Sequence, residues 1–544
     1  MIAFRNLLLA FVLGACAVQP PGPASVTLKL AAINDFHGNL ELPAGGVPVI
    51  DPVTQARTRA SAGGVARLAT VIDRMRAQNP HFAFVSSGDL VGASPLLSGY
   101  FDDEPTIEAM NSLGLDFNGV GNHEFDRGPV ELLRQQSGGC PRAGCKSGKP
   151  FGGAKFRFLA ANVIVRDTGA PLFPPYAIRE YGGIKVAFIG VTLKETPAVL
   201  TRAAVVGLYF TDEADTVNRL VPELKSAGVE AIVVLIHQGG FNRGDPNECT
   251  DFRGPIIDVV RRFDRAVDVV ISGHTHQAYI CRIEGRLVTS AGSYGRLVTE
   301  IELRLDPATR DVVAASAVNH VVRTDVPENP LLAALAARQA QLLKTLDRSV
   351  GRILTPVLNI QNADGESPLG QLIADAHLEA TKGEGAEVAF MNPGGIRVPV
   401  DFNNDGVVSY SALYAVQPFV NHLVTMTLSG AQILSLLEQQ WSVSGLRILQ
   451  VSKGSGFAWN PAAPAGARIE RGSVVINRQA LQPDRDYRVT VNSYLADGGD
   501  NLPMLREGRE RTNGASSLDA LVAYFERHSP VSPGAERRLR RVDP

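Results

Sequence analysis

The chain has 544 residues, of which 45% are hydrophobic and 20% are charged. This is an ordinary globular composition, and the length allows more than one hydrophobic core, since a domain usually takes about 100–200 residues. The formal net charge of −2 gives no electrostatic reason to expect a nucleic-acid polymer or an anionic membrane surface as the partner. Residues 536–541 (ERRLRR) are locally basic, and we expect a solvated tail there.

The N-terminus has the pattern of a signal peptide. Arg5 precedes an apolar block at residues 7–13, which is too short to span a bilayer, because a spanning helix takes about 20 apolar residues. Residues 13–16 (LGAC) resemble the lipobox of bacterial lipoproteins, so we expect a signal peptide at 1–15 and lipidation of Cys16. A plain secretory signal with an incidental cysteine is the alternative. In both cases we expect an exported protein, periplasmic or on the cell surface, with residues 16–25 as a tether. In the lipoprotein, the N-terminal lipid would be its one contact with the membrane.

Four cysteines remain after Cys16, an even number that suits an oxidising compartment. Four cysteines allow three pairings, and the pairing that we favour joins Cys140 to Cys145 and Cys249 to Cys281. A zinc site is the weaker interpretation, because no CxxC spacing occurs.

Residues 26–324 alternate short apolar runs with helical patterns, as in an α/β domain with mixed strands. The runs that predict strands are 26–33, 81–87, 185–191, 231–236 and 267–272. Apolar residues recur at helical spacing in 66–78 and 214–228.

The second half of the chain has a different pattern. Residues 325–347 contain a long Ala/Leu-rich stretch that predicts a linker helix between two domains. Residues 348–544 then read as a smaller α+β unit, with helices expected at 370–381 and 429–441.

Polar residues follow several predicted strands of the first half at the point where each strand ends. They are Asp35, His37, Asp89, Asn122, His123, Asp126, His237, His274 and His276. A single such residue is more often a cap or turn residue. Five of the chain's ten histidines fall at these ends, however, and turns have no need of histidine. Strand ends on one edge of an α/β sheet converge on a shared crevice, so these side chains are expected to form one site.

The donor set predicts a dinuclear metal centre. Four imidazoles, two carboxylates and an amide oxygen are too many ligands for one tetrahedral zinc, and they suit two divalent ions without a thiolate to bias the choice. Two ions about 3.5–4 Å apart with a bridging carboxylate form the clamp used in phosphate-ester hydrolysis. We expect Mn, Zn, Co, Fe or Mg.

The order of these stretches, DFH, GDL, GNHEFD, HQGG and GHTH, resembles that of the calcineurin-like metallophosphatases. The longer stretches INDFHGNL, SSGDLVGASPL and FNGVGNHEFDRG are similar to the exported 5′-nucleotidase family, and MNPGGIR, QPF and YLADGGDN extend the similarity into the second half. The resemblance implies an N-terminal four-layer α/β/β/α sandwich (26–324), joined by the linker helix to a smaller α+β substrate-binding domain (348–544).

The resemblance also implies roles, position by position. Asp35, His37 and His276 would hold one metal ion, Asn122, His237 and His274 the other, and Asp89 would bridge them. His123 would face the transferring phosphoryl group, held by Asp126. We assign no catalytic role to Glu124 and expect a loop carboxylate that satisfies backbone donors.

In the second half the resemblance implies a substrate site. Its residues are Asn392, Gly395, Arg397, Phe419, Tyr494 and Asp500. Arg397 can bind a phosphate or carboxylate bidentately, the two aromatic residues match positions that sandwich a nucleobase, and Asp500 matches one that binds ribose. Without the resemblance, the two aromatic residues would more often be core residues. Relatives often carry another arginine before the helix at 370–381, but residues 361–368 contain no basic residue.

The expected function is therefore phosphate release from nucleoside 5′-monophosphates and related small nucleotides by a metal-dependent phosphohydrolase. A 2′,3′-cyclic nucleotide phosphodiesterase with 3′-nucleotidase activity and a UDP-sugar hydrolase are the enzymatic alternatives. A surface lipoprotein that binds nucleotide or metal without turnover is the alternative of another class.

Overall fold

The computed structural model describes residues 25–50, 57–141, 144–344, 347–402, 404–419, 421–441, 448–534 and 536–542. The predicted signal peptide and Cys16 lie outside the described residues. Within the described part of the chain, no helix is long and apolar enough to cross a membrane.

Two six-stranded sheets form the centre of the first domain. One has the order β16 (Asp311–Val321), β15 (Leu297–Asp306), β1 (Val26–Ile33), β4 (Phe82–Ser86), β5 (Phe117–Gly119), β6 (Arg157–Leu159). The other has the order β13 (Ala278–Ile283), β14 (Arg286–Ala291), β12 (Val269–Ser272), β11 (Ala231–His237), β9 (Ile184–Thr192), β8 (Tyr176–Tyr181).

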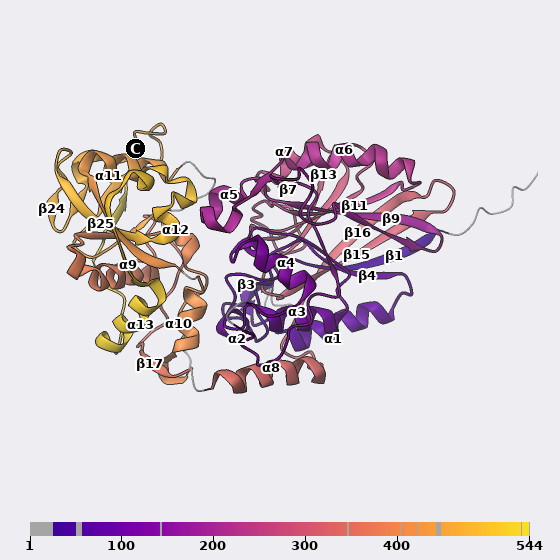
Figure 1. Cartoon of the computed structure of the whole chain (residues 1–544), viewed down its shortest axis with the longest axis horizontal. Coiled ribbons are helices and arrows are strands. Elements are labelled where there is room, and N and C mark those ends of the chain that lie inside the picture. The colour runs from indigo at the N-terminus through magenta and orange to yellow at the C-terminus, as the bar shows by residue number, and fades with distance from the viewer. Residues whose placement is uncertain are drawn as a thin grey trace, which may run out of the picture.

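The sheets pack face to face, and helices cover their outer faces, which gives the predicted α/β/β/α order (Figure 1). In β1, Leu28, Leu30 and Ala32 point between the sheets, whereas Ala31 and Ile33 point toward the helices. Both faces of the strand are therefore buried, which explains why its sequence is apolar almost throughout. The helices on the first sheet are α1 (Val65–Ala77), α3 (Glu104–Leu113) and α4 (Pro129–Ser137), and those on the second are α6 (Glu213–Ser226) and α7 (Ile256–Arg262).

The linker helix α8 (Pro330–Leu343) lies within the segment 325–347. The Asn329 side chain accepts hydrogen bonds from the N–H groups of Leu331 and Leu332 and so caps its first turn. Leu332 and Leu343 join the core of the first domain, so α8 packs on that domain before the chain enters the second.

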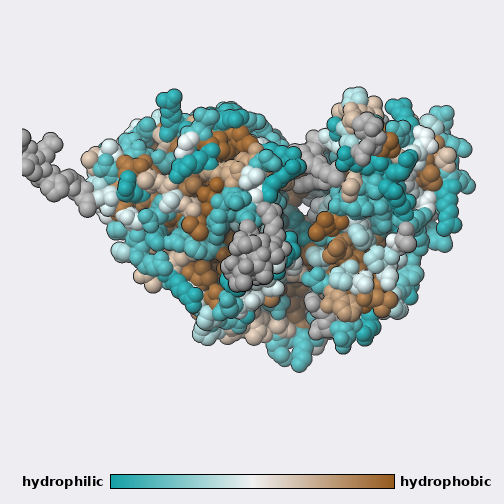
Figure 2. Space-filling model, turned by 180° about the vertical axis from the view of Figure 1, so that it is seen from behind, coloured by the Kyte–Doolittle hydropathy of each residue, from teal (hydrophilic) through white to brown (hydrophobic). Residues whose placement is uncertain are grey.

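The second domain contains a five-stranded sheet with three principal helices. Its order is β21 (Gln450–Val451), β18 (Val388–Met391), β25 (Asp486–Asn492), β20 (His422–Ser429), β26 (Arg509–Ser516). The helices are α9 (Pro368–Ala380), α11 (Gly430–Gln439) and α13 (Ser517–His528). From the opposite side, the two domains are separate lobes with a notch between them (Figure 2).

Two further predictions have clear outcomes. The favoured disulfide pairing is confirmed, since Cys140 is bonded to Cys145 and Cys249 to Cys281. The expectation of a solvated tail at 536–541 is wrong, because β27 (Leu539–Arg541) pairs in parallel with β22 (Phe457–Trp459).

The tail is held by an ion pair that its own sequence does not predict. The Arg538 guanidinium is buried and binds both carboxylate oxygens of Asp375 on α9, at 2.7 and 2.9 Å. A buried arginine is tolerated where a bidentate carboxylate satisfies it.

Candidate active site

The predicted metal ligands lie at one edge of the sandwich. β1, β4 and β5 run in parallel, and so do β11 and β12, so the ends of these strands meet on the same side. All seven side chains are brought together there. They form two groups of candidate ligands, Asp35 with His37 and His276, and Asp89 with His237 and His274. In each group the ligand atoms lie within 4.8 Å of one another.

Asp89 lies between the two groups. Its Oδ2 is 3.0 Å from Nε2 of His237 and 3.6 Å from Nε2 of His37, which is the placement expected of a bridging carboxylate. The seventh predicted ligand, Asn122, places its Oδ1 3.0 Å from Nδ1 of His274.

The histidine tautomers fit divalent cations. Nδ1 of His37 is 2.8 Å from the Gly92 carbonyl, and Nδ1 of His237 is 2.8 Å from the Ser87 carbonyl. Each Nδ1 therefore carries the proton, and each Nε2 turns its lone pair toward the carboxylates. Nε2 of His237 is buried and makes no hydrogen bond, so lone pairs of nitrogen and oxygen converge on one region. A cation there would relieve their repulsion.

The interaction between Asp89 and His237 also favours a positive charge at this place. Burial disfavours both charged forms, yet His237 lowers the pKa of Asp89, and Asp89 raises the pKa of His237. The Asp89 carboxylate therefore stabilises a positive charge at this buried position, and a cation bound there would take the place of a proton on Nε2 of His237.

The backbone of the site is unusual. Asp35, His37, Asp89, His274 and His276 all have positive φ, between 46° and 70°. Such a conformation costs a residue other than glycine roughly 1 kcal/mol or more. A side chain at Gly121 would not fit either, because its Cβ would lie 2.2 Å from Oδ1 of Asp89. The surrounding fold thus holds these five residues in a conformation that they would not adopt alone.

His123 lies beside the predicted ligands, and both its backbone and its ring are hydrogen-bonded. Its backbone N–H donates to Oδ1 of Asp89 at 2.8 Å, and its ring Nδ1 is 2.9 Å from Oδ2 of Asp126. Burial alone would lower the pKa of His123, but Asp126 and Asp89 outweigh it and raise that pKa. Since Nδ1 is engaged, Nε2 is the ring atom available to a ligand.

Glu124 is buried and serves the backbone, as predicted. Its carboxylate accepts hydrogen bonds from the N–H groups of Asp89 (2.9 Å), Leu90 (2.9 Å) and Gly121 (2.8 Å), and from the amide of Asn118 (3.1 Å). Burial raises the pKa of Glu124 to about 7. The residue ties the loop after β4 to the loop after β5.

Asn34 is a supporting residue that the sequence did not single out. Its amide donates to Oδ2 of Asp35 and to the Gly292 carbonyl, both at 2.7 Å, and its Oδ1 accepts from the Ala291 N–H at 2.7 Å. It therefore orients Asp35. Its position next to that residue in the sequence was the available signal.

The second domain brings its predicted residues to the same place. The Asn392 amide donates to Oδ2 of Asp500 at 2.8 Å, and the Tyr494 hydroxyl donates to Oδ1 of Asp500 at 2.7 Å. Arg397 reaches across the domain boundary, with one terminal nitrogen 3.0 Å from Nε2 of His37. The Phe419 ring centroid lies 6.1 Å from that of His123.

One cavity of about 480 Å³ joins these groups. All six predicted substrate residues line it, together with Asp89, Asn122, His123, Asp126, His274 and His276. Among the described residues, none of 361–368 lines it. In that segment Asp364 and Glu366 instead accept hydrogen bonds from the N–H groups of the C-terminal strand. Arg127, Val199 and Leu200 line the cavity without having been predicted. Arg127 directly follows the GNHEFD stretch, which was the available signal, whereas nothing in the local sequence of Val199 and Leu200 indicates a ligand.

Comparison with known proteins identifies the family. The model of the calcineurin-like phosphoesterases matches residues 28–278, and the model of the 5′-nucleotidase C-terminal domain matches residues 349–507. The chain belongs to the calcineurin-like phosphoesterases with a 5′-nucleotidase C-terminal domain. This phosphoesterase is a metal-dependent hydrolase, and its family uses two divalent metal ions.

Individual relatives extend over nearly the whole chain. The phosphoesterase is 29% identical to endonuclease YhcR of Bacillus subtilis (strain 168), a match that covers 95% of this chain but 41% of the relative's length. It is 26% identical to a 5′-nucleotidase of Vibrio parahaemolyticus, with 95% of this chain and 93% of the relative covered. The crystal structure of a 5′-nucleotidase precursor from Thermus thermophilus is similar with a TM-score of 0.78 and 28% identity, covering 95% of this chain and 99% of that one.

Proposed function

We propose that the protein releases phosphate from nucleoside 5′-monophosphates and related small nucleotides. The observation that carries the proposal is the single cavity shared by the metal-ligand groups of the first domain and the aromatic and polar side chains of the second. A nucleotide has both parts that such a cavity can recognise, a phosphoryl group and a base with its ribose.

In this proposal Asp35, His37 and His276 would hold one divalent ion and Asn122, His237 and His274 the other, with Asp89 as a ligand shared by both. Bound ions of this kind supply Lewis-acid stabilisation of phosphoryl oxygens and acidify water. The protein's contribution is the rigid orientation of the ligands by the Gly92 and Ser87 carbonyls and by Asn34.

His123 acts on the phosphoryl group through Nε2, since Nδ1 is bonded to Asp126. In that position it can donate a hydrogen bond to a phosphoryl oxygen or a proton to the leaving oxygen. A positioned acid–base group of this kind contributes typically ~10²–10⁴-fold to a rate.

The second domain determines which phosphate ester is held. Arg397 supplies donors for the phosphate, and Phe419 and Tyr494 offer ring faces to the base. Asp500 and Asn392, already bonded to each other, form the polar floor for ribose hydroxyls, with Gly395 allowing close backbone approach.

We also propose the domain division 26–324, 325–347 and 348–544, with export through residues 1–15 and an acyl anchor on Cys16. The precursor status of the Thermus thermophilus relative supports export. Metabolic labelling with a radioactive fatty acid, compared between the parent and Cys16→Ser, tests the anchor.

The test of function is a comparison of steady-state rates on AMP, 3′-AMP, 2′,3′-cyclic AMP and UDP-glucose with manganese or cobalt present. AMP should be the best of the four. If turnover of AMP were negligible and another ester were hydrolysed rapidly, that ester would be the substrate instead of AMP. Nucleotide binding without turnover of any of them would support the non-catalytic alternative.

A further inference from the structure

A second cavity, of about 420 Å³, lies on the other side of Arg397. Its walls come from the segment after the first predicted metal-ligand loop (Leu40, Glu41), α2 (Leu96–Gly99), Tyr294 between β14 and β15, and the end of α8, with the second domain opposite. Ala93 and Arg397 line this cavity and also the one that contains the metal-ligand groups. The Arg397 side chain is thus part of the partition between the two cavities.

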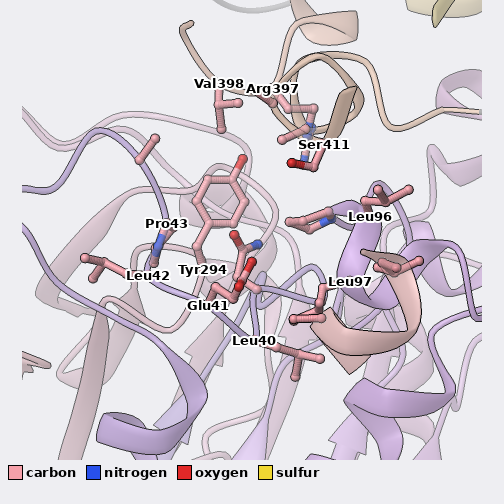
Figure 3. Close-up of a pocket in the computed structure, with 18 of the residues that line it drawn as sticks. Leu40, Glu41, Leu42, Pro43, Leu96, Leu97, Tyr294, Arg397, Val398 and Ser411 are labelled. Atoms are coloured by element: carbon pink, nitrogen blue, oxygen red, sulfur yellow. The ribbon is translucent and has the colours of Figure 1, made fainter. Parts of the chain in front are cut away.

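The body of the second cavity is apolar. Leu40, Leu96, Leu97 and Leu343 contribute to its walls and are themselves buried. Figure 3 shows Leu40, Leu96 and Leu97 on one side of the space, with Leu42 and Pro43 on another. A ligand there would gain from removal of apolar surface from water.

One end of the cavity carries hydrogen-bond donors without partners. The Tyr294 hydroxyl has no hydrogen-bond partner among the described residues, and Figure 3 shows it pointing toward Arg397, Val398 and Ser411. Nε of Arg397 is buried and unpaired, and within the described chain that guanidinium has no carboxylate partner. A phenol and a guanidinium at the same end form a site for an anion.

The rim of the cavity carries more acidic than basic side chains, in contrast to the end with Arg397. Glu41 and Asp347 lie there with Lys344, two acids against one base. Burial and the nearby Asp347 raise the pKa of Glu41, so a further negative charge at this rim is disfavoured. Charge complementarity therefore favours one anionic group at the Arg397 end and an uncharged remainder.

We propose that this cavity is a binding site for a small amphipathic monocarboxylate, with its carboxylate on Tyr294 and Arg397 and its apolar body along Leu40, Leu96 and Leu97. Occupation of the site holds Arg397 away from the neighbouring cavity. The bound acid therefore lowers the rate of phosphate release, a consequence that rests on the role proposed above for Arg397.

Calorimetric titration of the full-length protein tests binding directly. Octanoate should bind at least about tenfold more tightly than octylamine, octanol or the dicarboxylate suberate. Equal affinities for octanoate and octanol would overturn the anion site, and a preference for suberate would overturn the placement of the acidic rim.

A matched pair of variants on α8 tests the location. Ala340 lines the cavity, whereas Ala337, one turn earlier and also exposed, does not. Ala340→Trp should fill the space and weaken octanoate binding at least about tenfold, and Ala337→Trp should leave it unchanged. Tyr294→Phe removes one donor, worth about 0.5–1.5 kcal/mol, so the dissociation constant should rise ~2–13-fold. Unchanged octanoate affinity in Ala340→Trp would refute the site.

Inhibition of AMP hydrolysis by octanoate tests whether binding at the second cavity lowers the rate of phosphate release. The parent should be inhibited and Ala340→Trp should not. Equal inhibition of both would place the inhibitor in the nucleotide cavity and overturn the proposal. Should AMP not be a substrate at all, the calorimetric comparison still decides whether this site exists.

Discussion

Replacement of Glu124 by glutamine is the sharpest test of how the ligand loops are held. The two carboxylate oxygens divide the donors between them: Oε2 accepts from the N–H groups of Asp89 and Gly121, and Oε1 from Leu90 N–H and the Asn118 amide. A glutamine side chain has one oxygen and one NH₂ group. Whichever way it is turned, two buried donors lose their acceptor and face another donor.

The loss can be estimated from these contacts. Above pH 7 the carboxylate is charged, since burial raises the pKa of Glu124 to about 7. A hydrogen bond to a charged group is worth about 1.5–3 kcal/mol, so at such a pH Glu124→Gln should lower the free energy of unfolding by about 3–6 kcal/mol. Urea unfolding of the metal-free protein measures this. The matched control is Glu108→Gln on α3, where a partly exposed carboxylate pairs with Arg338 and the change should stay below about 1 kcal/mol. Equal stability of the two variants would show that Glu124 does not hold the loops together.

Other consequences can be tested in parallel. His123→Ala should lower the rate of phosphate release from AMP by ~10²–10⁴-fold at saturating metal with little change in metal affinity, and equal rates for variant and parent would exclude the assigned role. Removal of metal by a chelator should abolish phosphate release, and added manganese should restore it. The disulfide between Cys249 and Cys281 closes a loop across a sequence separation of 32, so the double serine variant should lose about 3–4 kcal/mol of stability in urea unfolding. Burial lowers the pKa of His377 to about 3 from its ordinary 6.5, and neither ring nitrogen makes a hydrogen bond. Its stabilising contribution is therefore complete above pH 6.5 and lost as the pH falls toward 3, by about 2 kcal/mol between pH 7 and pH 5, and His377→Leu should remove that part of the acid sensitivity.

The strands and helices that position the site were largely predictable. β1 and β11 are apolar on both faces, because each lies in a sheet covered by the other sheet on one side and by helices on the other. The run of residues 26–33 therefore predicted β1 with its full bounds. The histidines at strand ends were equally informative, since folding brings parallel strand ends to one edge.

Other features depend on tertiary contacts that no local pattern encodes. The positive φ of His37 and Asp89 is imposed by the loops that meet there. The basic C-terminal run resembles a solvated tail until Asp375, far away in sequence, supplies the bidentate partner for Arg538. Val199 and Leu200 reach the cavity from a segment whose composition is unremarkable.

The most direct test of the account is the effect of Phe419→Ala on two substrates, AMP and a phosphate monoester without a base, such as phenyl phosphate. Stacking on an aromatic side chain is worth about 1–3 kcal/mol per base. If the second domain binds the base of a nucleotide above the metal centre, kcat/KM for AMP should fall ~5–150-fold in the variant, and that for phenyl phosphate should change much less. An equal fall for both substrates, or no fall for AMP, would contradict the proposal that this cavity is a nucleotide site.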